Sequence, residues 1–69
     1  MKVRERVFGE TRDLDIGAHW RFQNQNAIWT TMDVDYETFS KEMLVLCNEG
    51  YFSAIQDGPA THYIVLKKP

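Results

Sequence analysis

The sequence contains a single cysteine, Cys47, and no long apolar run. One cysteine excludes an intramolecular disulfide, which is typical of intracellular proteins. No apolar stretch approaches the ~20 residues that a membrane-spanning helix requires. The first six residues lack the apolar centre of a signal peptide. We therefore expect a cytoplasmic protein that does not contact a membrane.

Residues that could carry chemistry are also scarce. His19, His62 and Cys47 are the only imidazoles and the only thiol, and no pair of them has metal-ligand spacing. Cys47 lies beside an apolar helical stripe, which favours a buried structural role. The four glycines are scattered and form no phosphate-binding loop. So small a domain also has little room for a ligand pocket of ~300 Å³. We expect no catalytic residue, no metal ligand and no cofactor, and hence no enzyme.

The composition is that of one small folded domain spanning residues 1–69. Hydrophobic residues make up 43% of the chain and aromatic residues 13%, which is more than disordered segments carry. A chain of this length buries only about 60% of its unfolded surface. Aromatic side chains bury a large area each, so they are expected to supply much of the core. Formation of a homodimer is a second route to stability.

Residues 35–49 form the clearest element, an amphipathic helix with both ends marked. Asp35 is suited to cap the first turn, because its carboxylate can accept from the free backbone amides. Gly50 can adopt the left-handed conformation that ends a helix. The apolar side chains recur at three- and four-residue steps along one face. They are Tyr36, Phe39, Met43 and Leu46.

The segments before this helix favour strands. Residues 2–8 alternate basic and other side chains, which is typical of an edge strand. Residues 18–22 and 27–34 predict a hairpin around a Gln/Asn loop. In that register Trp20 lies opposite Trp29 on one face of the sheet. That face either packs under the helix as core or forms an exposed patch that marks an interface.

Residues 51–55 and 61–66 predict two further strands joined by an Asp-Gly turn. The predicted fold class is therefore α+β, with element order β-β-β-α-β-β. One amphipathic helix packs on a small antiparallel sheet in this architecture.

The alternative is a winged helix. A helix that ends in Asn48-Glu-Gly-Tyr-Phe52, followed by a hairpin that ends in Tyr63-Ile-Val-Leu66, resembles the recognition helix and wing of that architecture. Residues 26–32 would then form the preceding helix and residues 33–35 the turn. Three observations weigh against it: the strand propensity of residues 28–31, the lack of a clear first helix, and acidic side chains where phosphate would bind.

Charge is unevenly distributed along the chain. Residues 33–57 contain six acidic residues and one lysine, a net charge of −5, whereas residues 1–12 carry four bases and two acids. We therefore expect a protein-interaction module, an adaptor or an inhibitor of the small kind that phages encode, which presents an acidic helix face to a protein partner. The candidate partner-binding residues are Asp35, Glu37, Lys41, Glu42, Glu49, Trp20 and Trp29.

Nucleic-acid binding is the second alternative. Basic side chains near the N-terminus could contact the phosphates of a single strand, and the aromatic residues Trp20, Phe22 and Trp29 could stack on its unpaired nucleobases. A core role for these aromatic side chains and an isoelectric point near 5.5 argue against this function.

Overall fold

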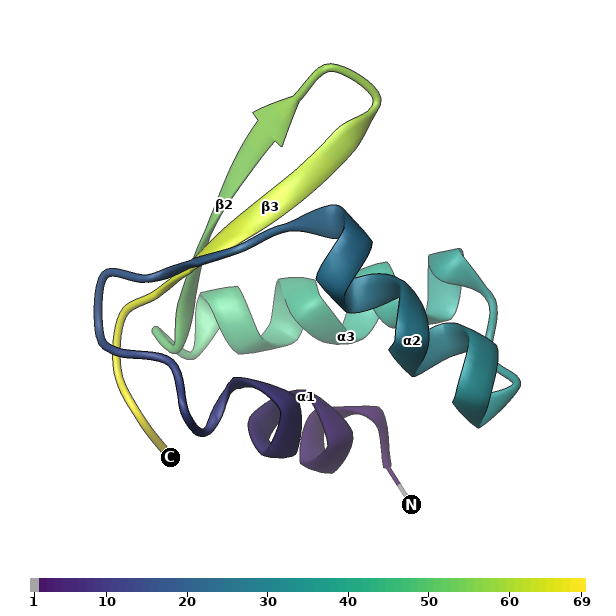
Figure 1. Ribbon diagram of the computed structural model, residues 1–69, viewed down its shortest axis with the longest axis horizontal. Helices are drawn as coiled ribbons and strands as arrows, with labels where there is room; N and C mark the ends of the chain where they lie inside the picture. Colours follow the sequence, from purple (N-terminus) through teal and green to yellow (C-terminus); the bar gives the residue numbers. More distant parts are fainter. Residues whose placement is uncertain (1) are drawn as a thin grey trace.

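The computed structural model describes residues 2–69, which form three helices and a three-stranded antiparallel sheet (Figure 1). The strand order in the sheet is β1-β3-β2. The predicted α+β class is confirmed, but the predicted order β-β-β-α-β-β is wrong. In chain order the elements are α1 (Val3–Thr11), β1 (His19–Trp20), α2 (Phe22–Met32), α3 (Tyr36–Asn48), β2 (Phe52–Asp57) and β3 (Ala60–Val65).

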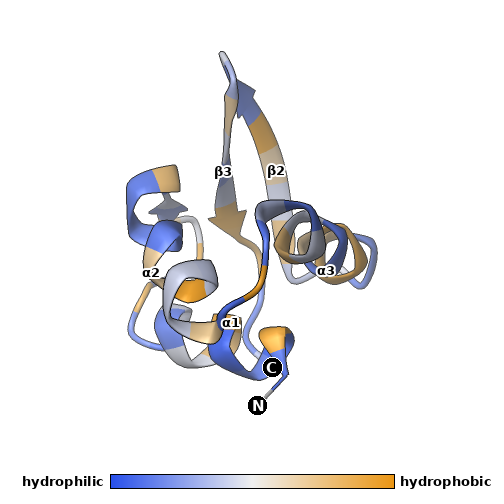
Figure 2. Cartoon of the chain, turned by 90° about the vertical axis from the view of Figure 1, so that its right-hand side faces the viewer, coloured by the Kyte–Doolittle hydropathy of each residue, from blue (hydrophilic) through white to orange (hydrophobic). Residues whose placement is uncertain are grey.

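The hairpin of β2 and β3 forms most of the sheet. Its register runs from the pair Phe52 and Val65 to the pair Asp57 and Ala60, and β1 adds only two residues on the other side of β3. The hairpin extends well away from the helices (Figures 1 and 2). Only its base can therefore pack against them, and its side chains become exposed toward the turn.

The core lies where the three helices meet the base of the hairpin. Trp20, Phe39, Phe52 and Tyr63 give it an aromatic centre, with ring centres of Trp20 6.2 Å from Phe39 and 6.3 Å from Phe52. Large aromatic side chains fill volume efficiently in so short a chain. The buried apolar residues are Val7, Trp20, Ile28, Phe39, Met43, Leu46, Phe52, Tyr63 and Val65.

Helix α3 confirms the helix predicted at residues 35–49. Phe39, Met43 and Leu46 are fully buried, so three of the four residues of the predicted stripe enter the core, whereas Tyr36 is 37% exposed. The Asp35 carboxylate accepts a hydrogen bond from the Thr38 amide at 2.8 Å. Gly50 has a φ of 89°, and the chain leaves the helix there.

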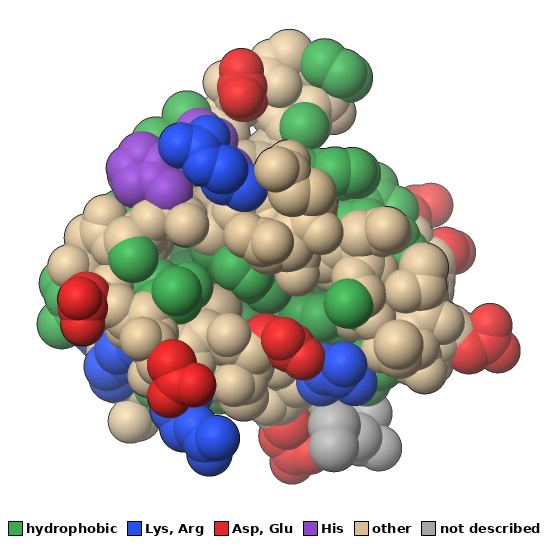
Figure 3. All heavy atoms as spheres, viewed as in Figure 1, with side chains coloured by type: hydrophobic (Ala, Val, Ile, Leu, Met, Phe, Trp, Pro, Cys, Tyr) green, Lys and Arg blue, Asp and Glu red, His purple; other side chains and the backbone are tan. Residues whose placement is uncertain are grey.

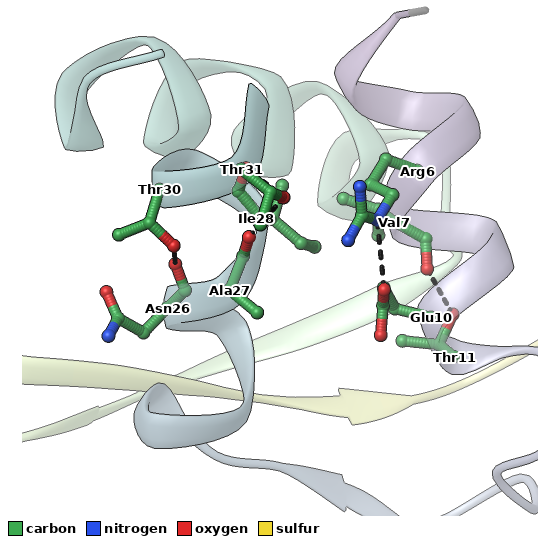
Figure 4. A network of polar contacts seen from close by, with 9 residues as sticks. All are labelled: Arg6, Val7, Glu10, Thr11, Asn26, Ala27, Ile28, Thr30 and Thr31. Carbon is green, nitrogen blue, oxygen red and sulfur yellow. Dashed lines mark hydrogen bonds and ion pairs between the residues drawn. The ribbon is translucent and has the colours of Figure 1, made fainter. Parts of the chain in front are cut away.

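The strand predicted at residues 2–8 is instead part of helix α1. Val3, Val7 and Thr11 recur every four residues, and Val7 and Thr11 are buried. The Thr11 hydroxyl donates to the Val7 carbonyl at 2.8 Å, and Arg6 pairs with Glu10 at 2.9 Å (Figure 4). The alternation of basic residues in this segment has the period of a strand. The segment is nevertheless helical, because a helix buries Val7 and Thr11 on one face.

The hairpin predicted at residues 18–34 is also wrong, because residues 22–32 form helix α2. Gln25 and Ile28 face the core and are fully buried. The β-branched Thr30 donates its hydroxyl proton to the Asn26 carbonyl at 3.0 Å, and Thr31 donates to Ala27 (Figure 4). These bonds to the carbonyl one turn earlier satisfy both hydroxyls within the helix.

The predicted pairing of Trp20 with Trp29 on neighbouring strands is therefore wrong. Trp20 lies on β1 and is 3% exposed, in the core. Trp29 lies on α2, where it is half-buried and packs against Phe39 with ring centres 4.9 Å apart.

Candidate functional site

The outward face of α3 is the candidate interaction site. We use this name for Glu37, Lys41, Leu44, Val45 and Asn48, the exposed residues opposite the buried stripe of the helix. Leu44 is 61% exposed and Val45 is 42% exposed. The aliphatic pair thus lies in water between polar neighbours, although buried apolar positions exist one residue away on either side.

Glu37 and Lys41 neutralise each other at the first half of this face. The Lys41 ammonium lies 3.3 Å from the Glu37 carboxylate, one helical turn apart, and both side chains are about three-quarters exposed. Such exposed pairs contribute little to stability because water and salt screen them. Their effect here is to leave this part of the face without a net charge.

Asp35 acts as the N-cap of α3. Hydrogen bonds from Thr38 hold the pKa of Asp35 below its ordinary value, because they stabilise the carboxylate. This is the capping role that the sequence predicts. The carboxylate remains exposed and can still attract a cation, but one of its oxygens is already engaged.

Glu49 is held by Arg4 at the other end of α3. The guanidinium contacts both carboxylate oxygens, at 2.7 and 3.3 Å, and so joins α1 to α3. These hydrogen bonds lower the pKa of Glu49 and raise that of Arg4. The half-buried Glu42 adds to the negative potential around the same arginine. Of the six acidic residues predicted for this segment, Glu37 and Glu49 are thus paired with a cation.

A partly exposed aromatic cluster was not predicted. The ring centres of Phe22, Trp29 and Tyr36 lie 5.3–5.8 Å apart. Phe22 opens α2, Trp29 lies in its last turn and Tyr36 opens α3. Phe22 is 38% exposed and Tyr36 is 37% exposed. The three residues are spaced seven apart, which would indicate one face of a single helix. The turn at residues 33–35 interrupts that helix, so the spacing alone did not predict the cluster. Of the two tryptophans predicted to bind a partner, only Trp29 is partly exposed.

The basic residues do not gather on α3. Lys67 lies 4.6 Å from the centre of the Tyr51 ring, and Lys68 donates to carbonyls at the end of α1 and in the following loop, those of Thr11, Arg12 and Leu14. These contacts fix the C-terminal segment against α1. They also hold two cations away from the outward face of α3.

A hollow of about 430 Å³ opens between α1 and the C-terminal segment. It is larger than the sequence led us to expect. Phe8, Phe52 and Val65 form its floor, and Arg12, Lys67 and Lys68 lie at its edge. None of the side chains that line it within residues 2–69 is a carboxylate, an imidazole or a thiol.

Cys47 is half-buried, and burial raises the pKa of its thiol. A raised pKa disfavours the reactive thiolate. This agrees with a structural role.

Comparison of the chain with known protein families, with curated proteins and with solved structures finds no match. Over residues 2–69, the helices are too short and too polar to cross a bilayer.

Proposed function

We propose that this chain is a non-enzymatic protein-interaction module built on a winged-helix scaffold, and that the outward face of α3 contacts the partner. The element order α1-β1-α2-α3-β2-β3 and the sheet order β1-β3-β2 support the scaffold. In this arrangement α2, the three residues 33–35 and α3 correspond to a helix-turn-helix. The β2–β3 hairpin corresponds to the wing (Figure 1).

The exposure of Leu44 and Val45 is the observation that carries the proposal. Both positions lie at the middle of the helix that such scaffolds present to their ligand. Exposed aliphatic side chains contribute nothing to the binding of phosphate. Their removal from water by a partner stabilises the complex. A protein surface with an apolar centre is therefore the favoured ligand.

The charges around the pair define the rim of that contact. Glu37 and Lys41 neutralise each other and Glu49 is paired with Arg4, so Glu42 and Asp35 provide the remaining negative charge. The proposed partner is a protein that buries Leu44 and Val45 and places polar donors or a cation near Glu42. Because Asp35 and Glu42 are the unpaired charges of this rim, its affinity should depend only moderately on salt.

DNA binding is the second candidate, favoured by the helix-turn-helix arrangement itself. Lys41 and Asn48 point outward on α3, where a recognition helix would contact base edges. Ser40, which would have the same role, is half-buried. Against this function, α3 contains one lysine and two glutamates, with Glu49 as its C-cap, and phosphate contacts require cations.

The test replaces the aliphatic pair and compares the result with a matched surface change. The double variant Leu44→Asp, Val45→Asp should lose a partner that the unmodified chain captures from its host. The control Asn24→Asp, Ala27→Asp adds two aspartates to exposed positions of α2 and should retain that partner. Circular dichroism verifies that both variants are folded.

A partner that binds both variants equally would contradict the proposed site. A duplex DNA probe provides the competing measurement. Binding at low salt that falls steeply as salt rises, and that is lost in Lys41→Glu, would identify α3 as a DNA-reading helix instead.

A further inference from the structure

Two histidines that are far apart in the sequence meet on the outer face of the sheet. His19 lies on β1 and His62 on β3, and their ring nitrogens Nδ1 and Nε2 are 3.2 Å apart. The two imidazoles lie next to each other at the surface (purple in Figure 3). They are the only histidines in the chain, so their contact is not a consequence of abundance.

The sheet register holds the two rings on the same face. His19 pairs with Ile64, and His62 lies two residues before Ile64 on the same strand. Alternate residues of a strand share a face, so both imidazoles point outward while their neighbours Trp20 and Tyr63 point into the core. Burial of Trp20 and Tyr63 therefore determines the position of the histidines.

The separation of the rings fits a shared metal ion. Two imidazole nitrogens bound to one zinc ion at ~2.0–2.1 Å and a tetrahedral angle lie ~3.3 Å apart, with ring centres ~5 Å apart. The observed values are 3.2 Å between the nitrogens and 5.1 Å between the ring centres. A linear hydrogen bond of the same length would place the ring centres ~5.5 Å apart. The rings thus meet at an angle rather than head-on.

The charges near the pair are balanced. His62 lines a shallow hollow of about 100 Å³ together with Arg21 and Asp57. The guanidinium repels a cation and the carboxylate attracts one, so their effects on cation binding oppose each other. Within residues 2–69 no group of three or more potential ligands surrounds this point. Two positions of a four-coordinate ion would therefore be filled by water.

We propose that His19 and His62 form a two-histidine binding site for a borderline divalent cation such as Zn²⁺. Imidazole is a preferred ligand for Zn²⁺, Cu²⁺ and Ni²⁺. Each ring binds through its inner nitrogen and keeps its proton on the outer one, so the present ring-to-ring hydrogen bond is exchanged for two metal bonds. The ion connects His19 on β1 to His62 on β3, and so adds a link to the two residue pairs of this short ladder.

Titration of the full chain with zinc chloride tests the site. Calorimetry should show one ion per chain, and nitrogen-15 spectra of the imidazoles should show the largest shifts at Nδ1 of His19 and Nε2 of His62. His19→Gln and His62→Gln should each weaken the affinity at least tenfold. Cys47→Ser, which removes the only thiol, should leave it unchanged. Zinc should also raise the unfolding temperature of the unmodified chain but of neither histidine variant.

Three results would overturn the proposal: no binding at millimolar zinc, an affinity that either histidine variant retains, or binding that Cys47→Ser removes. The nitrogen shifts are measured on the unmodified chain, so they decide the question even where a variant folds poorly.

Discussion

The side-chain amide of Gln25 donates a hydrogen bond to the backbone carbonyl of Trp20 at 2.9 Å. The same nitrogen lies 3.2 Å from the carbonyl of Thr61. Gln25 is fully buried, so one amide group of α2 satisfies carbonyls at the end of β1 and on β3. Its own oxygen has no partner among the described residues. This side chain joins α2 to both β1 and β3.

Replacement of Gln25 by Met should destabilise the fold by ~1–3 kcal/mol. Methionine preserves the volume, but it removes the side-chain donor that the carbonyls of Trp20 and Thr61 share. Urea unfolding measures the loss. The exposed neighbour Gln23 provides the control, because Gln23→Met should change stability by less than ~0.5 kcal/mol. Equal stability of the two variants would show that these hydrogen bonds contribute nothing.

Gln25 also explains why sequence patterning missed α2. Gln25, Ile28 and Met32 lie three and four residues apart, which is the spacing of one helical face. Because Gln25 is polar, a search for apolar residues at that spacing does not find this face. The β-branched residues that follow then favour a strand on propensity alone. Tertiary packing overrides that propensity. Helix α3 was predictable because its cap, its stripe and its terminal glycine all agree.

Adjacent residues of α3 should respond very differently to truncation. Met43 is fully buried, and Met43→Ala should cost ~2–5 kcal/mol because it leaves a cavity in the core. Leu44 is 61% exposed, and Leu44→Ala should change stability by no more than ~0.5 kcal/mol. Chemical unfolding of the two variants checks the orientation of the helix. A large loss from Leu44→Ala would mean that this side chain is not free for a partner.

Asp35→Ala should lower the unfolding temperature by removing the cap of α3. The effect should depend on pH. The folded-state pKa of Asp35 is below its ordinary value of 3.8, so its contribution is present above that value and is lost as pH falls through the folded pKa. The difference in unfolding temperature between the variant and the unmodified chain should therefore shrink between pH 5 and pH 2. A difference that stays constant over this range would contradict a role for the ionised carboxylate.

Asp33 provides a test of the turn between α2 and α3. It has a φ of 56°, in the left-handed region, and its N–H donates to the Trp29 carbonyl. Glycine adopts this conformation without steric cost, so Asp33→Gly should raise stability by up to ~1 kcal/mol. Asp33→Val should lower stability by ~1–2 kcal/mol, because a β-branched side chain disfavours positive φ. The opposite order in thermal unfolding would mean that the turn has another conformation.

The meeting of His19 and His62 was not predictable from the sequence, for a physical reason. Their contact depends on the pairing of β1 with β3, and β1 has only two residues. Neither propensity nor periodicity can identify so short a strand. Conversely, the net charge of −5 over residues 33–57 predicts an acidic face on the helix at 35–49. Arg4, which neutralises Glu49, lies 45 residues away in the sequence. Contacts between distant residues decided both cases.

The final prediction concerns Tyr63, which is 4% exposed and belongs to the core. Burial raises its pKa from 10.0 to about 12. Between these values the unfolded chain releases the phenolic proton while the folded chain retains it, so the free energy of the unfolded state falls relative to that of the folded state as pH rises. Stability should therefore fall by roughly 2 kcal/mol between pH 10 and pH 12 from this group alone. Tyr63→Phe has no proton to release and should remove this part of the pH dependence. Urea unfolding of both chains at pH 8, 10 and 11.5 measures it, and parallel curves would mean that the phenol is open to solvent in the folded state.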